Sequence, residues 1–277
     1  MEEIGILTLL ILVANGLMTY KGLNDRVFLE KYSFNVGNII SDKAYKTLIT
    51  SGFLHVNWSH FLFNMITLYL FSSGLEAVIG IPSFFLIYFG SLVGGNLLAL
   101  YIHRNHLDYS AVGASGAVSG LIFASIALFP GIEIGFILLP IAIPGWIFGL
   151  AYVIYSIYGI KSQSDNIGHE AHLGGGILGL VIAVVLYPHL LSTNTLPIAL
   201  ILLPSLVFLI AIIKKPHLLI ISNPFLKKSN NQSLEDRYNA KKVDKQSEID
   251  KLLDKINKNG YENLSEKDRE RLKKLTK

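Results

Sequence analysis

Residues 113–120 read GASGAVSG, a run of small side chains that contains Ser115 between an alanine and a glycine. Long apolar segments precede and follow this run, so it lies within the most hydrophobic part of the chain. Alone, such a run more often marks a close contact between two helices than a nucleophile, because small residues let two backbones approach. The chemistry of Ser115 therefore depends on the segments around it.

The chain of 277 residues is too apolar for an ordinary soluble domain, with 51% hydrophobic residues and a positive mean hydropathy. It has no cysteine, which excludes a disulfide framework, a thiolate nucleophile and a cysteine metal site. Residues 1–213 carry seven Lys/Arg against ten acids, whereas residues 214–277 carry 17 against ten. The sequence thus predicts an apolar body followed by a basic, polar tail.

Seven segments are apolar enough to be membrane spans, since a transmembrane helix needs about 20 mostly apolar residues. They are residues 4–20, 57–78, 82–102, 115–129, 134–158, 171–188 and 196–213. Glu2 and Glu3 precede the first segment, and this acidic start indicates a retained span rather than a cleaved signal peptide. Pro140 and Pro144 place the true start of the fifth helix nearer Pro144, and Pro204 makes the seventh either a kinked span or a re-entrant hairpin.

The fourth segment is too short to cross the membrane. Its 15 residues make about 22 Å of helix, against an apolar layer of about 30 Å. We therefore expect Ser115 to begin a helix below the membrane surface. Residues 104–114 would form a loop that dips toward it, which is tolerated at that depth only beside a cavity or within protein.

Four polar residues lie near helix ends on what would be one side of the membrane, if the spans alternate. Polar side chains within spans are costly and usually functional, although a histidine or asparagine there can simply bond a neighbouring helix. Ser115 needs a base to become a nucleophile, and His172 is the candidate. His60 and Asn64, four residues apart on one helix face, can donate N–H groups to an oxyanion, as can the first turn of the fourth helix.

A metal site and a third catalytic acid are both weaker interpretations. The segment GHEAHLGG, residues 168–175, spaces its two histidines three apart and does not match HExxH. Glu170 is two residues from His172 and would face away on a helix, and Asp165 is the other nearby acid. We therefore expect a Ser–His pair without an acid, without a metal and without a cofactor.

Three motifs, each beginning a span, resemble those of the rhomboid intramembrane serine proteases. They are HVNWSHFLFN at 55–64, GASG at 113–116 and AHLGG at 171–175, and the resemblance covers roughly residues 45–190. It implies a six-helix core with a Ser–His dyad in a water-filled cavity. Ser115 would be the nucleophile and His172 the general base, His60 and Asn64 would form the oxyanion hole, and Gly113 would shape the approach to the serine.

Two GxxxG pairs, Gly116 with Gly120 and Gly175 with Gly179, predict that the fourth and sixth helices approach closely. That approach would bring the serine and histidine within hydrogen-bond reach. The chain departs from the family pattern at Ser119, where some bacterial members have an aromatic residue that stacks on the histidine. Support for the histidine must then come from elsewhere. The Trp-Arg pair common in the family's first loop is also absent.

We thus predict an all-α polytopic membrane protein. It comprises a rhomboid-like six-helix core in residues 1–190, a seventh span in 191–213 and a basic, helical tail in 214–277. The resemblance implies an intramembrane serine endopeptidase that cleaves transmembrane segments, favouring small residues at the cleavage point. The alternative is a catalytically inactive rhomboid-like binder or chaperone of membrane-protein clients. Expected partners are the lipid bilayer and transmembrane substrates, with no nucleic acid.

Two arguments disagree on orientation. The basic residues gather on the side of the 21–56 loop and the tail, which the positive-inside rule places in the cytoplasm. The resemblance implies that the active-site side faces outward, and we favour it because long loops and domains weigh little in the rule. The compact core and short loops predict a bacterial cytoplasmic membrane. The tail is equally well interpreted as a membrane-surface helix or a partner-binding module.

Overall fold

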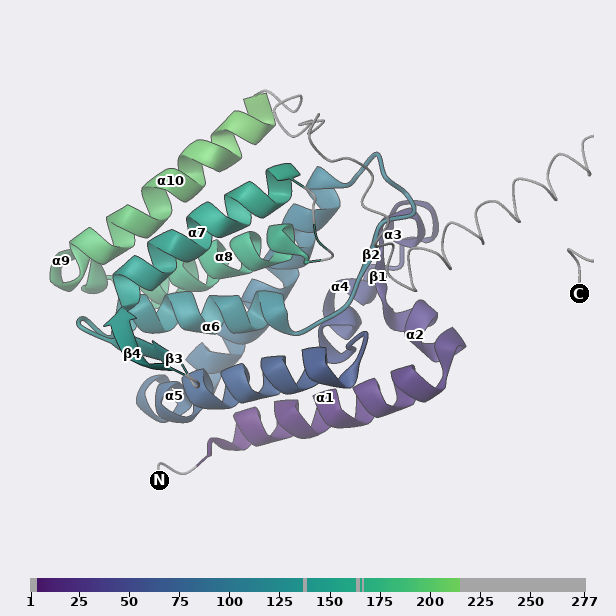
Figure 1. Ribbon diagram of the computed structural model, residues 1–277, viewed down its shortest axis with the longest axis horizontal. Helices are drawn as coiled ribbons and strands as arrows, with labels where there is room; N and C mark the ends of the chain where they lie inside the picture. The colour runs from purple at the N-terminus through teal and green to yellow at the C-terminus, as the bar shows by residue number, and fades with distance from the viewer. Residues whose placement is uncertain (1–3, 137–138, 163–164, 166, 215–277) are drawn as a thin grey trace, which may run out of the picture. The chain divides into compact units, whose positions relative to one another are not determined.

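The structure, a computed structural model, describes residues 4–136, 139–162, 165 and 167–214 (Figure 1). Helices dominate it, with two short antiparallel strand pairs. In chain order the elements are α1 (Ile6–Asn24), α2 (Arg26–Tyr32), β1 (Phe34–Asn35), α3 (Val36–Asp42), α4 (Thr47–Thr50), the 3₁₀ turn η1 (Ser51–Phe53), α5 (Trp58–Ile102), β2 (Ser110–Ala111), α6 (Ser115–Leu128), β3 (Glu133–Phe136), β4 (Leu139–Pro144), α7 (Gly145–Ser162), α8 (His169–Leu186), α9 (Leu190–Thr193) and α10 (Thr195–Lys214).

Helix α6 is the centre of the molecule. It packs against α5 and α8, and every residue from 116 to 127 is buried (Figure 1). A helix that is apolar all round is stable only when it is enclosed in this way. Its 14 residues span about 21 Å, less than the apolar layer of about 30 Å. The helix begins at Ser115, as the run of small residues predicts.

Several helices are long and apolar enough to cross a membrane. By length and composition these are α1, the Gly74–Ile102 part of α5, α8 and α10. Gly80 has a φ of +74° within α5, a conformation that glycine adopts at little cost. It divides α5 into two helical stretches, which correspond to the separate spans predicted at 57–78 and 82–102. The protein is therefore an all-α polytopic membrane protein.

The predicted span 134–158 is wrong in its first part, because residues 134–136 belong to β3, which pairs with β4. The expectation that its helix begins nearer Pro144 is confirmed, since α7 begins at Gly145. A proline lacks the N–H of a helical turn, so Pro144 ends the hairpin and the helix starts after it. The re-entrant interpretation of residues 196–213 is wrong, because α10 is one continuous helix that contains Pro204. The helices predicted in the tail lie outside the described residues.

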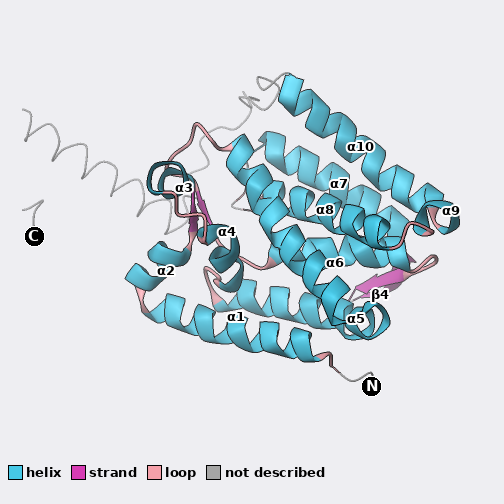
Figure 2. Cartoon of the chain, turned by 180° about the vertical axis from the view of Figure 1, so that it is seen from behind, coloured by secondary structure: helices cyan, strands magenta, loops and turns pink. Residues whose placement is uncertain are grey.

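The segment between α1 and α5, interpreted from the sequence as a loop, is mostly helical. Its strand β1 pairs with β2, joining Phe34 to Ala111 and Asn35 to Ser110 (Figure 2). The N–H of Gly37 also donates to the carbonyl oxygen of Leu107 at 2.9 Å. The loop that leads into Ser115 is thus tied to the N-terminal part of the chain.

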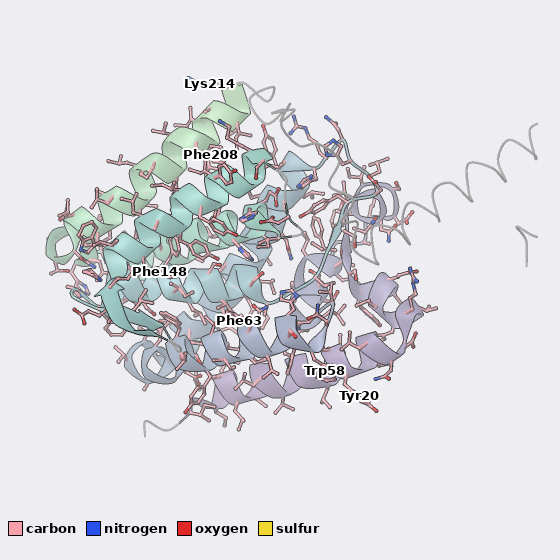
Figure 3. All side chains as sticks on the ribbon, viewed as in Figure 1. Tyr20, Trp58, Phe63, Phe148, Phe208 and Lys214 are labelled. Atoms are coloured by element: carbon pink, nitrogen blue, oxygen red, sulfur yellow. The ribbon has the colours of Figure 1, made fainter. Side chains whose placement is uncertain are left out.

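One end of the α1–α5 pair carries exposed aromatic side chains. Tyr20, near the end of α1, and Trp58, at the start of α5, are 63% and 49% exposed (Figure 3). Tryptophan and tyrosine prefer the membrane–water boundary, where an apolar ring and a polar tip both find a partner. The exposed rings are what a membrane–water boundary favours, and the first turn of α5, which includes His60, lies at the same end of the pair.

Glu76 is a buried acid with a structural role. Its carboxylate accepts hydrogen bonds from the N–H groups of Leu7 and Thr8, both at 2.9 Å, and from the Thr8 hydroxyl at 2.7 Å. A negative charge is favourable at the positive end of a helix, and here it satisfies N–H groups that the first turn of α1 leaves without partners. Glu76 therefore caps the start of α1.

Candidate active site

Ser115 follows a backbone turn that only glycine adopts easily. Gly113 has a φ of +138°, and its N–H donates to the carbonyl oxygen of Ser51 at 3.0 Å. The next N–H, that of Ala114, donates to Nε2 of His55 at 3.5 Å. These two bonds hold the chain on both sides of the turn immediately before the serine.

His55 is a neutral bridge between α1 and this turn. Burial, and then the neighbouring His60 ring, lower the pKa of His55 to about 3. Because its Nε2 accepts from Ala114, its Nδ1 carries the proton and donates to Oγ1 of Thr19 at 2.9 Å. The Thr19 hydroxyl in turn donates to the carbonyl oxygen of Phe53 at 3.3 Å. This role of His55 could not be predicted from the sequence, because its partners lie far along the chain.

His60 and Asn64 occupy the first turns of α5. The Asn57 side chain caps the helix by accepting the N–H of His60 at 2.8 Å, and the Asn64 amide donates to the His60 carbonyl oxygen at 3.0 Å. Asn64 is 7% exposed. Its amide has a second N–H, which this bond does not use.

His60 and Ser115 both lie beside Gly113. A Cβ built on Gly113 would lie 2.9 Å from Cε1 and 3.0 Å from Nε2 of His60, and 3.6 Å from Oγ of Ser115. The His60 ring thus packs directly against Gly113, and any side chain at position 113 would have to displace it. The glycine therefore allows the imidazole and the serine hydroxyl to lie beside the same short piece of backbone.

Helices α6 and α8 are in direct backbone contact at their glycines. A Cβ on Gly116 would lie 3.1 Å from the carbonyl oxygen of Ala171, the residue before His172. A Cβ on Gly175 would overlap the carbonyl oxygen of Gly116, and one on Gly179 would overlap that of Gly120. The turns that carry Ser115 and His172 are therefore as close as two helical backbones can be.

Between the two described side chains, Ser115 and His172, the structure has no direct hydrogen bond. Both are half-buried. The His172 ring instead lies beside two other rings, with centroids 6.1 Å from Tyr152 and 6.2 Å from His169. Catalytic hydrogen bonds commonly shorten only when substrate binds, so this geometry is compatible with a dyad.

The two nearby acids have other partners. Glu170 Oε1 bonds Nε2 of His103 at 2.9 Å, with both side chains buried, and the Tyr109 ring stacks on His103 at 3.7 Å. Asp165 bonds Nε2 of His169 at 3.1 Å. Glu170 thus joins the start of α8 to the end of α5, and neither bond reaches His172.

We expect Glu170→Ala to lower the free energy of unfolding by about 3 kcal/mol, because it leaves His103 buried without its partner. Unfolding in detergent, followed by circular dichroism, measures this. Glu30→Ala is the matched control: its bond to Arg26 has the same 2.9 Å length but is more than half exposed, and should contribute about 1 kcal/mol or less. Equal losses in the two variants would contradict a structural role for the buried pair.

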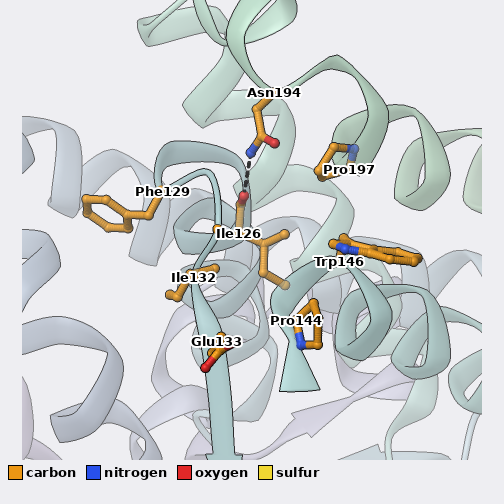
Figure 4. Close-up of a pocket in the computed structure, with 9 residues that line it drawn as sticks. Ile126, Phe129, Ile132, Glu133, Pro144, Trp146, Asn194 and Pro197 are labelled. Atoms are coloured by element: carbon orange, nitrogen blue, oxygen red, sulfur yellow. Dashed lines mark hydrogen bonds between the residues drawn. The ribbon is translucent and has the colours of Figure 1, made fainter. Parts of the chain in front are cut away.

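A separate pocket lies at the other end of α6 (Figure 4). There the Asn194 amide donates to the carbonyl oxygens of Ile126 and Ala127, at 2.7 and 3.0 Å, and so caps α6. Glu133 is the one ionisable residue among those that line it. The pocket has no nucleophile–base pair and is not the candidate active site.

Helices long enough to cross a membrane surround a short, buried helix that begins with a serine. This arrangement defines a polytopic membrane protein with a polar site within its core. The family model described as the Rhomboid domain matches residues 42–189, and the chain belongs to the rhomboid family. A second model, for a family of unknown function (DUF6576), matches residues 232–277 in the tail.

Several curated relatives support this membership. Rhomboid protein 1, mitochondrial, of Saccharomyces cerevisiae is 29% identical over 157 residues, which are 56% of this chain and 45% of the relative. The putative rhomboid protease YdcA of Bacillus subtilis is 40% identical over 88 residues, 32% of this chain and 42% of the relative. The rhomboid protease AarA of Providencia stuartii is 29% identical over 192 residues, which are 60% of this chain and 66% of the relative. The chain thus spans about half the length of such relatives.

Proposed function

We propose that this protein is an intramembrane serine endopeptidase that cleaves transmembrane segments of membrane proteins. Ser115 is the nucleophile and His172 the general base, and His60 and Asn64 are the oxyanion donors. The observation that carries the proposal is the close packing at Gly113, which places the serine hydroxyl and the His60 imidazole beside the same glycine. The backbone contact of α6 with α8 supports it, because it brings the His172 turn to the same place.

The first half of the reaction makes an acyl-enzyme. Ser115 Oγ attacks the carbonyl carbon of the scissile peptide while His172 takes the hydroxyl proton. The carbonyl oxygen becomes an oxyanion and accepts hydrogen bonds from His60 and Asn64. When the intermediate collapses, the C–N bond breaks and His172 returns the proton to the leaving amine. In the second half, water attacks the ester, His172 again carries the proton, and Ser115 is regenerated.

The start of α6 can contribute to oxyanion binding. Ala114 supplies no side-chain cap, and the first N–H bonded within this end of the helix is that of Val118, which donates to the Ala114 carbonyl oxygen. The N–H groups of Ser115 to Ala117 are therefore not used by the helix. Such groups, together with the positive end of the helix, attract negative charge.

The test uses the full chain in liposomes with a single-span test substrate and a fluorophosphonate probe. We expect cleavage within the substrate's membrane segment, and probe labelling at Ser115 that requires an intact His172. A chain that only binds client proteins would hold the substrate without cutting it and would not be labelled. Absence of both cleavage and labelling in the reconstituted parent would overturn the proposal.

Replacing His60 or Asn64 by alanine is expected to lower kcat about 10²–10³-fold with little change in KM, because the donors act on charge that develops in the transition state. Steady-state cleavage measures both constants. Asn15→Ala is the matched control: it is also buried and donates to the carbonyl oxygen four residues earlier, but it lies on α1. A loss confined to KM would argue against the oxyanion role.

A further inference from the structure

Ser119 connects the nucleophile's turn to α7. Its hydroxyl donates to the carbonyl oxygen of Ser115 at 2.8 Å and lies 2.7 Å from the hydroxyl of Tyr152. A serine hydroxyl has a single proton, which is used in the first bond. The Tyr152 hydroxyl must therefore be the donor in the second, and the bonds run in one direction from α7 through Ser119 to Ser115.

The Tyr152 ring is confined on several sides. The centroid of its ring is 5.6 Å from that of Phe123, with 73° between the two ring planes. It is 5.8 Å from the centroid of Phe148, which is also on α7 (Figure 3). On a third side the His172 ring lies at 6.1 Å with a tilt of 33°. These separations are all within the range of attractive ring pairs, about 4.5–7 Å. With its hydroxyl bonded as well, the ring has little freedom to turn.

The His172 ring has fewer constraints of its own. In the described part of the chain no hydrogen bond reaches its ring nitrogens, and its ring neighbours are Tyr152 and His169. The orientation of the imidazole thus depends on packing. His169 is itself held by Asp165, whereas Tyr152 is held by the residue one turn after the nucleophile.

We infer that Tyr152 is a positioning residue for His172, anchored through Ser119 to the turn that carries Ser115. This inference rests on the proposed function. It assigns to Tyr152 on α7 the support of the imidazole that an aromatic residue at position 119 would otherwise give. Ser119 and Tyr152 then act together, Tyr152 by packing on the imidazole and Ser119 by holding Tyr152. A ring that fixes the imidazole matters because a misplacement of about 1 Å at a reacting group can cost about 10²-fold in rate.

The test compares variants of the full chain in liposomes. Tyr152→Leu removes ring and hydroxyl, and we expect kcat to fall about 10²-fold with KM within about twofold, and the rate of fluorophosphonate labelling at Ser115 to fall in parallel. Tyr152→Phe keeps the ring and should recover most of that loss. Tyr158→Leu is the matched control, since Tyr158 is on the same helix but 64% exposed, and it should cleave as the parent does.

A double-mutant cycle tests the anchor. Tyr152→Phe removes the bond between the two hydroxyls, and Ser119→Ala removes that bond together with the one to the Ser115 carbonyl oxygen, so the double variant should lose no more kcat than Ser119→Ala alone. Additive losses would overturn the anchor. Ser119→Ala also removes little volume, so the cycle stays informative if Tyr152→Leu does not fold.

Two failures are distinguishable. If the parent is labelled at Ser115 and cleaves, but Tyr152→Leu keeps the parental kcat and labelling rate, the positioning role is wrong and the proposed function stands. A Tyr152→Leu loss that only follows the folded fraction, measured by unfolding, would equally overturn it. If the parent is neither labelled nor active, the proposed function itself fails, and this inference with it.

Discussion

Ser115→Ala is expected to abolish cleavage, with a fall in rate of at least about 10⁴-fold to the background of the assay. The alanine removes the only atom that can form the ester, while α6, already buried along its length, keeps its packing. His172→Ala should have an effect of the same size, because the hydroxyl is a poor nucleophile without a base. Cleavage of the single-span substrate in liposomes measures both.

The double variant is expected to be no worse than either single one, since a nucleophile and its base act as a unit. Ser125→Ala is the matched control, because Ser125 is a buried serine on the same helix, about three turns further along. It should cleave like the parent. Undiminished cleavage by Ser115→Ala would mean that another group attacks the substrate, and the assignment would be abandoned.

Gly175→Ala is expected to reduce both stability and activity. The added methyl would overlap the carbonyl oxygen of Gly116, and backbone atoms cannot rotate away as a side chain does. The helices α6 and α8 must then separate, which costs about 1–3 kcal/mol or more for overpacking. A shift of about 1 Å between the nucleophile and base turns would cost about 10²-fold in kcat.

Thermal unfolding in detergent and steady-state cleavage measure the two effects. Gly16→Ala is the control: it makes the same substitution in a helix, but the new methyl would meet only Phe61 Cζ at 3.8 Å. We expect it to be tolerated and slightly stabilising, because alanine favours a helix more than glycine does. A Gly175→Ala variant that behaves like Gly16→Ala would show that the helices are not in tight contact there.

The sequence was most informative where a feature is local. The start of α6 at Ser115 and the division of α5 near Gly80 follow from small residues, glycine and proline at fixed positions. The β3–β4 hairpin was missed because its residues are as apolar as a span, and composition alone does not separate a strand from a helix. The side of the membrane and the bacterial location stay predictions.

Contacts between distant elements could not be predicted. Nothing in the sequence pairs Ser119 with Tyr152, or His103 with Glu170, because those bonds depend on how α7 and α8 rotate against their neighbours. The role of His55 was missed for the same reason, since its partners come from α1 and from the turn before α6. The three motifs indicated the candidate site residues, and the fold shows which side chains from distant elements contact their turns.

The bridge from Thr19 through His55 to Ala114 extends the support of the Ser115 turn beyond the residues that the Rhomboid model matches. Thr19 and the strand Phe34–Asn35 both lie before residue 42, where the Rhomboid match begins, yet both brace the loop that delivers the nucleophile. The structural unit around Ser115 is therefore longer than the domain that the family model recognises. A shortened form of the chain should keep the first helix, because α1 supports the turn before Ser115 through Thr19.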